Sequence, residues 1–495
     1  MSGSPDAVVV GSGPNGLAAA LTLAAAGLVV LVIEGASSPG GGCRTEELTL
    51  PGYRHDVCAT AHPLALASSF FTRFDLRARG VRLAHPGAVF AHPLERGRAA
   101  VVRRSVDETA ADLGADGTMY RDLLGPLVAH WSEVADWVLS DWRSLPRSPF
   151  AVAGYGIRAI GPASALARRF RTEDVRALMA GVSAHSMRPL ETSPTAGVGL
   201  FLTILAHAVG WPFVEGGSAR LITAMVDALQ AAGGRIETGW WLSSLDELPP
   251  ARAVLLDVTP RRFLEIAGPR LNGRYRRSLE GFRYGVGVCK VDFALAGPVP
   301  WSNSASREAG TLHLGGTFEE VARSEAAVVG GRHPDRPYVL AVQAGSADPT
   351  RAPAGGHTLW TYCHVPAGSN VDMSDRIEAQ VERYAPGFRD LILAKTRRSA
   401  AEQEHHNPNY VGGDIGSGRQ DLGQTLARPA MRWDPYRTPL RGIYLCSSAT
   451  PPGPGVHGRC GELAALSALR HSFGISDPPD VGRWRPTSMA PPAGA

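Results

Sequence analysis

The residues that first indicate chemistry form a glycine-rich turn close to the amino terminus. The turn reads GSGPNG over residues 11–16 and contains Gly11, Gly13 and Gly16, and Glu34 follows 18 residues after the third glycine. Glycine at these positions permits a tight turn, a close approach of the backbone to a pyrophosphate, and close packing of a strand against a helix. Free N–H groups at the helix start would bind the phosphates, and Glu34 would accept hydrogen bonds from ribose hydroxyls. The spacing therefore predicts a dinucleotide-binding site.

A second glycine-rich stretch follows Glu34 and contains a cation. Residues 35–45 read GASSPGGGCRT, so Arg44 could make a charge-assisted contact with a phosphate. This extended pattern resembles the flavoprotein superfamily that includes amine oxidases, carotenoid desaturases and GDP-dissociation inhibitors. The resemblance implies FAD as the cofactor, a choice that the first turn alone leaves open.

A loop near the carboxyl terminus carries the same resemblance. Residues 442–461 read GIYLCSSATPPGPGVHGRCG, where a strand would deliver Ser447 and Ser448 to the ribityl and phosphate region of the cofactor. The helix start after the loop could stabilise negative charge on a reduced flavin. The predicted cofactor-binding residues are Gly11, Ser12, Gly13, Pro14, Asn15, Gly16, Glu34, Gly35, Gly41, Gly42, Arg44, Thr45, Trp241, Leu242, Ser447, Ser448, Gly455, Val456 and His457.

Three further motifs narrow the resemblance to one branch of this flavoprotein superfamily. They are RTEELTLPGYRHDV at residues 44–57, LLDVTP at 255–260 and NPNYVGGDI at 407–415. With the carboxy-terminal loop they are similar to the phytoene desaturase and carotenoid isomerase branch. Within that branch the sequence resembles the phytoene dehydrogenase-like proteins, a group that includes pyridine nucleotide-disulfide oxidoreductase domain-containing protein 2. The resemblance spans residues 6–470 and implies an apolar substrate pocket and frequent peripheral contact with membranes. No redox-active CxxC pair is present.

Four polar residues are candidates for a catalytic role: His62, His457, Asp56 and Arg459. Histidine titrates near neutrality and suits proton transfer, although each histidine could instead be a structural hydrogen-bonding residue. Asp56 could instead fix the local turn through its side chain. The family loop usually reads VHGMCGYH, whereas this chain has VHGRCGEL at residues 456–463. Arg459 therefore indicates either a structural ion pair with Glu462 or a more polar substrate.

Several other residues have both a functional and a structural interpretation. The backbone of Gly412, Gly413 and Asp414 could approach the flavin or substrate, or form a tight turn. Cys460 could tether a flavin, although inert burial is commoner. His207 is expected to be a buried helix residue with one partner. Adjacent histidines such as His405 and His406 are poorly spaced for one metal site, so we predict none.

Secondary-structure patterns indicate how these residues are positioned. Strands are expected at residues 7–10, 28–33, 235–241, 253–258 and 442–446, and helices at 17–26, 119–138, 218–232 and 461–471. Alternation at residues 285–295 and 338–344 predicts antiparallel strands. We predict an α/β fold in which a Rossmann-type FAD-binding domain carries an inserted α+β substrate domain. The FAD-binding domain would comprise residues 1–85, 215–268 and 432–475, the substrate-binding domain 86–214 and 269–431, and a flexible tail 476–495.

Composition limits the class of protein. The 50 basic and 46 acidic residues nearly balance, which gives no electrostatic basis for nucleic-acid binding. Six cysteines without paired spacing, and no signal peptide, predict a cytoplasmic protein, with peripheral membrane contact as the alternative. The apolar stretch at residues 196–214 contains three glycines and a proline and is expected to be a buried helix that could line an apolar tunnel.

The function predicted from these features is an FAD-dependent desaturase or oxidase acting on an apolar, polyene or other secondary-metabolite substrate. No second nucleotide motif is present, so oxygen or a quinone is expected to reoxidise the flavin. A redox-neutral double-bond isomerase on the same fold is the alternative. A lipid-binding escort protein is a further alternative, and the intact glycine turn with Glu34 and Arg44 argues against it.

Overall fold

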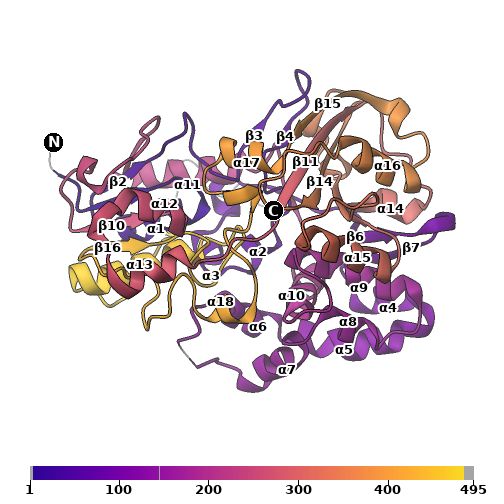
Figure 1. Ribbon diagram of the computed structural model, residues 1–495, viewed down its shortest axis with the longest axis horizontal. Coiled ribbons are helices and arrows are strands. Elements are labelled where there is room, and N and C mark those ends of the chain that lie inside the picture. The colour runs from indigo at the N-terminus through magenta and orange to yellow at the C-terminus, as the bar shows by residue number, and fades with distance from the viewer. Residues whose placement is uncertain (1–3, 144, 484–495) are drawn as a thin grey trace, which may run out of the picture.

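A five-stranded parallel sheet carries the glycine turn (Figure 1). Its order is β16 (Ile443–Leu445), β10 (Ala253–Leu256), β1 (Ala7–Val10), β2 (Val30–Ile33) and β9 (Arg235–Glu237). The computed structural model describes residues 4–143 and 145–483, and these strands come from three separated segments of that chain. Because every pairing in the sheet is parallel, the carboxyl ends of the strands meet at one edge.

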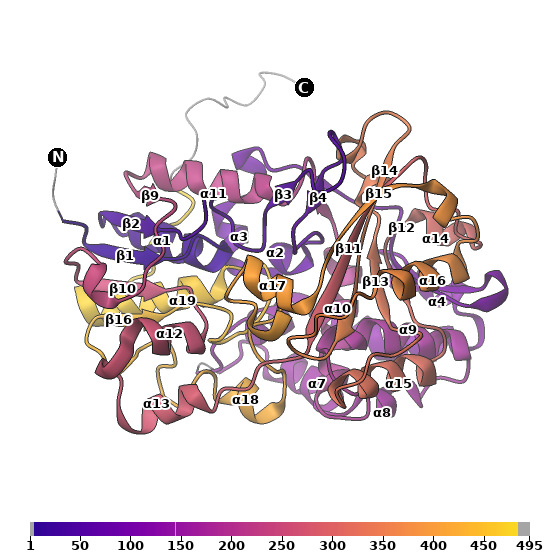
Figure 2. The ribbon, with the colours of Figure 1, turned by 45° about the horizontal axis from the view of Figure 1, so that its top comes forward.

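Short apolar strands suit this sheet because both of its faces are buried. Ala7 and Val9 lie in one core, whereas Val8 and Val10 lie in another on the opposite face. Figure 2 shows α11 on one side of the sheet, with α12 and α13 on the other. The first core contains α1 (Pro14–Ala25), α11 (Ala219–Ala231) and α19 (Arg459–Ala468), and the second contains α12 (Pro260–Ala267) and α13 (Gly273–Glu280).

A seven-stranded mixed sheet forms the second part of the molecule. Its order is β15 (Ile392–Arg398), β11 (Gly287–Leu295), β14 (His357–Val365), β13 (Val339–Val342), β12 (Ala309–Leu314), β6 (Ala88–Pro93) and β7 (Ala99–Val102). Only the β12–β6 pairing is parallel in the described sheet. The antiparallel strands predicted at residues 285–295 and 338–344 are β11 and β13. The predicted fold class, a Rossmann-type α/β domain with an α+β part, is therefore confirmed.

Helices between β7 and β8 (Phe213–Val214) pack against this second sheet and are grouped at the lower right of Figure 1. They are α4 (Val106–Asp112), α5 (Gly117–Ala129), α6 (Trp131–Val138), α7 (Pro149–Ala159), α8 (Ala163–Ala167), α9 (Glu173–Ser183) and α10 (Thr195–Ala208). The single helix predicted at 119–138 is wrong, because His130 leaves the helical conformation (φ −115°, ψ 28°) and separates α5 from α6. The buried helix predicted in the apolar stretch is α10. Within the described residues no helix has the length and apolar character needed to cross a bilayer.

The remaining α-helices and β-strands lie in the segments between the strands of the two sheets. They are β3 (Thr45–Glu46), β4 (His55–Asp56), β5 (Leu83–Ala84), β8 (Phe213–Val214), α2 (Pro63–Ala67), α3 (Ser69–Phe74), α14 (Ser304–Glu308), α15 (Phe318–Val329), α16 (Ser374–Tyr384), α17 (Ala400–His406) and α18 (Leu422–Leu426).

Several predicted element ends differ from those observed. The first helix begins at Pro14, three residues early, and Gly27 follows it with φ +87° as expected of a helix terminator. The strand predicted at 235–241 already ends at Glu237. In the segment predicted as a tail, the Val481 side chain is buried and the Arg483 guanidinium donates to the Ala25 carbonyl. Residues 484–495 lie outside the described residues.

A buried charged cluster joins the two parts of the molecule. Arg351 donates to Asp56 Oδ2 at 2.8 Å and to Asp348 Oδ2 at 2.7 Å, and all three side chains are buried. Asp56 also accepts from the Ser218 backbone N–H at 2.8 Å and from the Thr45 hydroxyl at 2.7 Å. Burial alone would raise the pKa of Asp56, but the Arg351 charge and these hydrogen bonds lower it. The cluster therefore holds β4 against the start of α11 and the loop after β13.

Replacing Arg351 should show how strongly this cluster stabilises the fold. Arg351→Met leaves two buried carboxylates without their cation, so we expect the free energy of unfolding to fall by about 3–5 kcal/mol. The matched control is Arg121→Met, because Arg121 pairs with Asp107 on the surface at 2.6 Å. Such exposed pairs contribute about 0–1 kcal/mol. Urea unfolding of both variants measures the difference, and equal losses would contradict the role given to the cluster.

Candidate functional site

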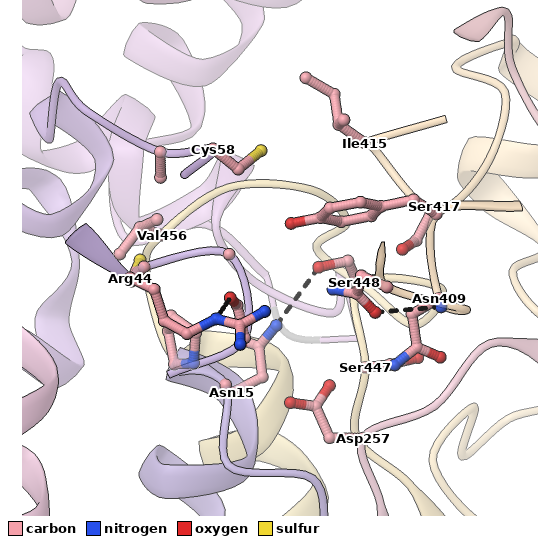
Figure 3. Close-up of a pocket in the computed structure, with 18 of the residues that line it drawn as sticks. Asn15, Arg44, Cys58, Asp257, Asn409, Ile415, Ser417, Ser447, Ser448 and Val456 are labelled. Carbon is pink, nitrogen blue, oxygen red and sulfur yellow. Dashed lines mark hydrogen bonds between the residues drawn. The ribbon is translucent and has the colours of Figure 1, made fainter. Parts of the chain in front are cut away.

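One cavity of about 610 Å³ extends from the glycine turn to the seven-stranded sheet. Its wall includes residues from the carboxyl ends of β1, β2 and β10 and from the loop after β16, as parallel α/β sheets favour. Figure 3 shows Asn15, Arg44, Asp257 and Ser448 facing the same space. Of the predicted cofactor-binding residues, those that line it are Gly11, Ser12, Gly13, Pro14, Asn15, Glu34, Gly35, Gly41, Gly42, Arg44, Trp241, Leu242, Ser447, Ser448, Gly455 and Val456. Gly16, Thr45 and His457 do not line it.

The two glycine-rich turns pack directly on each other. A Cβ on Gly16 would lie 2.0 Å from the Gly11 carbonyl oxygen, so only glycine allows α1 to start this close to β1. Gly41 has φ +54°, and a Cβ there would lie 3.1 Å from Gly13 Cα. The N-cap residue of α1 is Gly13, which has no side chain to cap the helix. The turn therefore presents backbone and a helix dipole to the cavity, as an anion site requires.

Glu34 lies at the end of β2 and holds the turn through its carboxylate. Its Oε2 accepts from the Ser12 backbone N–H at 2.9 Å and from the Ser12 hydroxyl, and its Oε1 accepts from the Ala36 N–H at 2.8 Å. These bonds fix the carboxylate at the cavity wall, the position expected of a ribose acceptor.

Arg44 also lines the cavity, and its orientation is fixed by neighbours. Its Nε donates to the Gly41 carbonyl at 3.1 Å, and its terminal nitrogen lies 3.1 Å from His406 Nε2. Burial and nearby cations, including Arg398 and Arg44, lower the pKa of His406 to about 4, so this ring is neutral and can accept. His405 and His406 both line the cavity. The described residues contain no group of three or more side chains placed to hold a metal ion.

Asn15 and Ser448 join the two ends of the sequence. Asn15 Nδ2 donates to Ser448 Oγ at 3.3 Å, while Asn15 Oδ1 is buried and has no partner among the described residues. The hydroxyl of the neighbouring Ser447 instead donates to the Val258 carbonyl at 2.7 Å. The structure therefore places the amino-terminal turn and the carboxy-terminal loop in one wall of the cavity.

Asp257 is a site residue that the sequence prediction missed. It follows β10, and its Oδ2 accepts from the Gly16 N–H at 2.9 Å on the cavity side of the turn. Burial and the nearby Glu34 charge raise the pKa of Asp257 to about 7. The signal was present in the sequence, because a polar residue directly after a buried parallel strand lies at the ligand-binding edge of the sheet.

His62 is the one predicted catalytic residue that lines the cavity. Its Nε2 lies 2.9 Å from Ser218 Oγ, which itself donates to the Ala59 carbonyl at 2.6 Å. The serine hydrogen is thus already used, so His62 Nε2 carries the ring proton and Nδ1 carries the lone pair. That Nδ1 is buried and has no hydrogen-bond partner among the described residues. Burial lowers the pKa of His62 to about 4, so its ring is neutral at physiological pH.

The other three candidates lie outside the cavity lining. Asp56 belongs to the buried Arg351 cluster. His457 donates from Nε2 to the Gly453 carbonyl at 3.1 Å and accepts at Nδ1 from the Arg459 N–H at 3.0 Å. Arg459 forms the predicted ion pair with Glu462, and its Nε donates to the Leu139 carbonyl at 3.1 Å. All three side chains therefore hold the fold around the site.

The structure also shows the surroundings of the other residues for which the sequence allowed either a functional or a structural role. Gly412 and Gly413 have φ of +65° and +82°, and Asp414 accepts from three backbone N–H groups, so this segment is a tight turn outside the cavity lining. Cys460 is buried and free. The expectation of one partner for His207 is wrong, because it contacts the Tyr120 hydroxyl at 2.7 Å and the Arg104 carbonyl at 3.1 Å.

The far end of the cavity is apolar and aromatic. Leu202 and Trp211 come from the apolar stretch that was expected to line a tunnel. The other residues at this end were not predicted, and they are His185, Thr311, Leu340, Val342, Trp360, Tyr362 and Ile415. Most of them stand on strands of the seven-stranded sheet, where sequence alternation predicts two faces and does not say which face meets a ligand.

Comparison with known proteins defines the class to which this fold belongs. The model of the NAD(P)-binding Rossmann-like domain matches residues 9–74. An oxidoreductase from Methanosarcina mazei has a similar structure, with a TM-score of 0.61 and 18% identity over 94% of this chain and 99% of that chain. Wild-type putrescine oxidase bound to putrescine gives a TM-score of 0.57 and 17% identity over 94% and 98%. Cyclohexylamine oxidase from Brevibacterium oxydans gives 0.57 and 15% over 96% and 99%. The chain therefore has the fold of these oxidoreductases.

The sequence of this chain is also similar to that of a named relative. Pyridine nucleotide-disulfide oxidoreductase domain-containing protein 2 of Rattus norvegicus is 25% identical over 547 aligned positions, which cover 94% of this chain and 93% of that protein. The Mus musculus protein of the same name is 25% identical over 548 positions. Its name mentions a disulfide, but all six cysteines of this chain are free in the structure.

The packing of α1 against α19 provides a test of how the site is assembled. A Cβ on Gly461 would lie 1.8 Å from the Asn15 carbonyl oxygen. Gly461→Ala should therefore force the helices apart and lower the free energy of unfolding by about 1–3 kcal/mol. Gly125→Ala in α5 meets nothing within 4 Å and should stabilise by about 0.5–1 kcal/mol. Urea unfolding gives both values, and a shift of the same sign in the two variants would refute the close contact.

Proposed function

We propose that this protein is an FAD-dependent oxidoreductase that removes hydride equivalents from an apolar, carbon-rich substrate. The observation that carries the proposal is one continuous cavity, which is lined by the glycine-rich turns at one end and by apolar and aromatic side chains at the other. A dinucleotide with a hydrophobic ring system needs both kinds of surface in continuity. The oxidoreductase relatives and the shared fold support the same class.

The residues present fit such a cofactor. Gly11, Gly13 and Gly41 form a cradle that side chains would fill, and the buried Asn15 Oδ1 lacks a partner among the described residues. We assign the pyrophosphate to the glycine turn, the ribose to Glu34, and the ring system to the side of Gly455 and Val456. When bound, FAD supplies a ring that accepts a hydride from carbon and passes electrons to oxygen or a quinone.

The apolar end determines which substrates the cavity favours. Among the described lining residues the only carboxylates are Glu34 and Asp257, and both lie at the glycine turn. A cationic amine would enter the far end without an anionic partner, which is costly in a water-poor space. Leu202, Trp211 and Trp360 instead offer apolar contact area. These walls favour a polyene or similar lipophilic substrate and exclude water from it.

His62 is our candidate for holding the substrate proton. Its Nδ1 carries a lone pair that is unused among the described residues, and the Ser218 contact fixes the ring orientation. A neutral imidazole can accept a proton as the C–H bond breaks. Since both nitrogens of His457 are already bonded, that residue is not our choice.

Replacing His62 tests whether this residue acts in hydride removal from the substrate and not in FAD binding. His62→Gln should leave the FAD content unchanged but slow anaerobic bleaching of the flavin by apolar hydride donors by about 10²- to 10⁴-fold. The control is His92→Gln, because His92 is equally buried, has a pKa lowered to about 4 by burial, and does not line the cavity. Stopped-flow absorbance measures the rates of both variants. Equal slowing in the two would count against a chemical role for His62.

The same preparation distinguishes the alternative functions. A purified protein that takes up no FAD would contradict the proposal and favour an escort protein. A product of unchanged mass would indicate a redox-neutral isomerase, whereas desaturation removes two hydrogens.

A further inference from the structure

Asp257 lies against the glycine turn and lines the cavity. Its Oδ2 lies 3.2 Å from the positions that a Cβ would take on both Gly13 and Gly16, and its own Cβ lies 3.1 Å from that position on Gly11. The same oxygen accepts from the Gly16 N–H at 2.9 Å. Figure 3 shows the carboxyl group below Asn15 and Ser448, on the cavity side. The carboxyl group therefore shares the concave face of the turn with any bound phosphate.

A charged carboxylate in this place would oppose the binding of an anion. Like charges in a buried site each disfavour the ionised form of the other. A neutral carboxyl group would instead offer one O–H donor to a phosphate oxygen, while its second oxygen keeps the Gly16 N–H. The geometry thus suits only the protonated form of Asp257 when a pyrophosphate is bound.

The Gly16 N–H, which donates to Oδ2, favours the charged form of Asp257 in the free protein, but burial and the nearby Glu34 carboxylate oppose it. Glu34 faces it from β2, Cys446 from β16 and Cys460 from α19. Arg262 of α12 also lines the cavity, but its guanidinium bonds Glu265 and the Leu242 carbonyl and stacks 4.4 Å from the Trp241 ring centre. In the described part of the chain Asp257 forms no ion pair. Its pKa of about 7, raised mainly by burial, agrees with this environment.

We propose that Asp257 binds the cofactor pyrophosphate directly and as the neutral acid, so that one proton is taken up when the cofactor binds. This inference rests on the proposed dinucleotide site, and it goes beyond it by assigning a ligand and a proton to a residue that the glycine motif does not include.

The direction of the pH dependence follows from this coupling. Below about pH 6 the group is protonated before binding, so affinity should not change with pH. Above pH 7 the free protein loses the proton that the complex needs. Affinity should then fall by up to about tenfold for each pH unit until the pKa of the complex is reached.

The experiment is a titration of flavin-free protein with FAD, and in parallel with ADP, at pH 6 and pH 8.5. Fluorescence quenching reports FAD binding, and calorimetry of the FAD titration in two buffers of different ionisation enthalpy reports proton uptake, because the pyrophosphate of FAD does not itself titrate between these pH values. For the wild type we expect Kd to rise by at least about tenfold at the higher pH, with uptake of close to one proton at pH 8.5. For Asp257→Asn we expect the low-pH affinity at both pH values and no uptake, because the amide supplies the same donor and acceptor.

Controls separate this inference from the proposed function. Asp227→Asn changes an exposed carboxylate on α11 and should behave as the wild type. If the wild type binds neither FAD nor ADP at any pH, the proposed dinucleotide site itself is wrong. If FAD binds without proton uptake, or if Asp257→Asn keeps the wild-type pH dependence, the assignment to Asp257 is overturned. Loss of binding by a folded Asp257→Asn protein at pH 6 would overturn the neutral-acid model as well.

Discussion

The structure depends on how closely backbone can approach backbone at the start of α1. Gly16 lies against the Gly11 carbonyl, and Gly461 of α19 lies against the Asn15 carbonyl, at distances that a single methyl group would prevent. These two contacts hold α1 and α19 together as a pair. The pair packs on β1 and β16, which are the first and last strands of the parallel sheet in sequence order. The carboxyl ends of β1, β2 and β10 and the loop after β16 then surround one space, and the glycine turn becomes the floor of a cavity.

The two ends of that cavity differ because different sheets build them. The parallel sheet contributes backbone N–H groups and short polar side chains, while the mixed sheet and α10 contribute aromatic and aliphatic side chains. The Asp56–Arg351–Asp348 cluster holds the junction between them, so the distance between the polar and apolar ends is fixed by buried charge. His62 lies close to this junction and is tied to it through Ser218.

Local sequence predicted the glycine-turn end of the site well. The strand at residues 7–10, the turn, the helix and Glu34 follow each other within 34 residues, so their mutual geometry is set by short-range rules. Prediction was weaker where tertiary contacts decide. The break at His130 and the early end of β9 were not visible in residue patterns. Trp360 and Tyr362 reach the cavity only because distant strands align, and the bonding of both His457 nitrogens depends on the folded loop.

The central claim is that one FAD molecule spans both ends of this cavity. The most direct measurement is the difference electron density of crystals of the protein grown with FAD. We predict density for the pyrophosphate on the turn between Gly11 and Gly16, with the ring system extending past Val456 towards His62. Density elsewhere on the surface, or a cavity that remains filled by its own side chains at saturating FAD, would contradict the account.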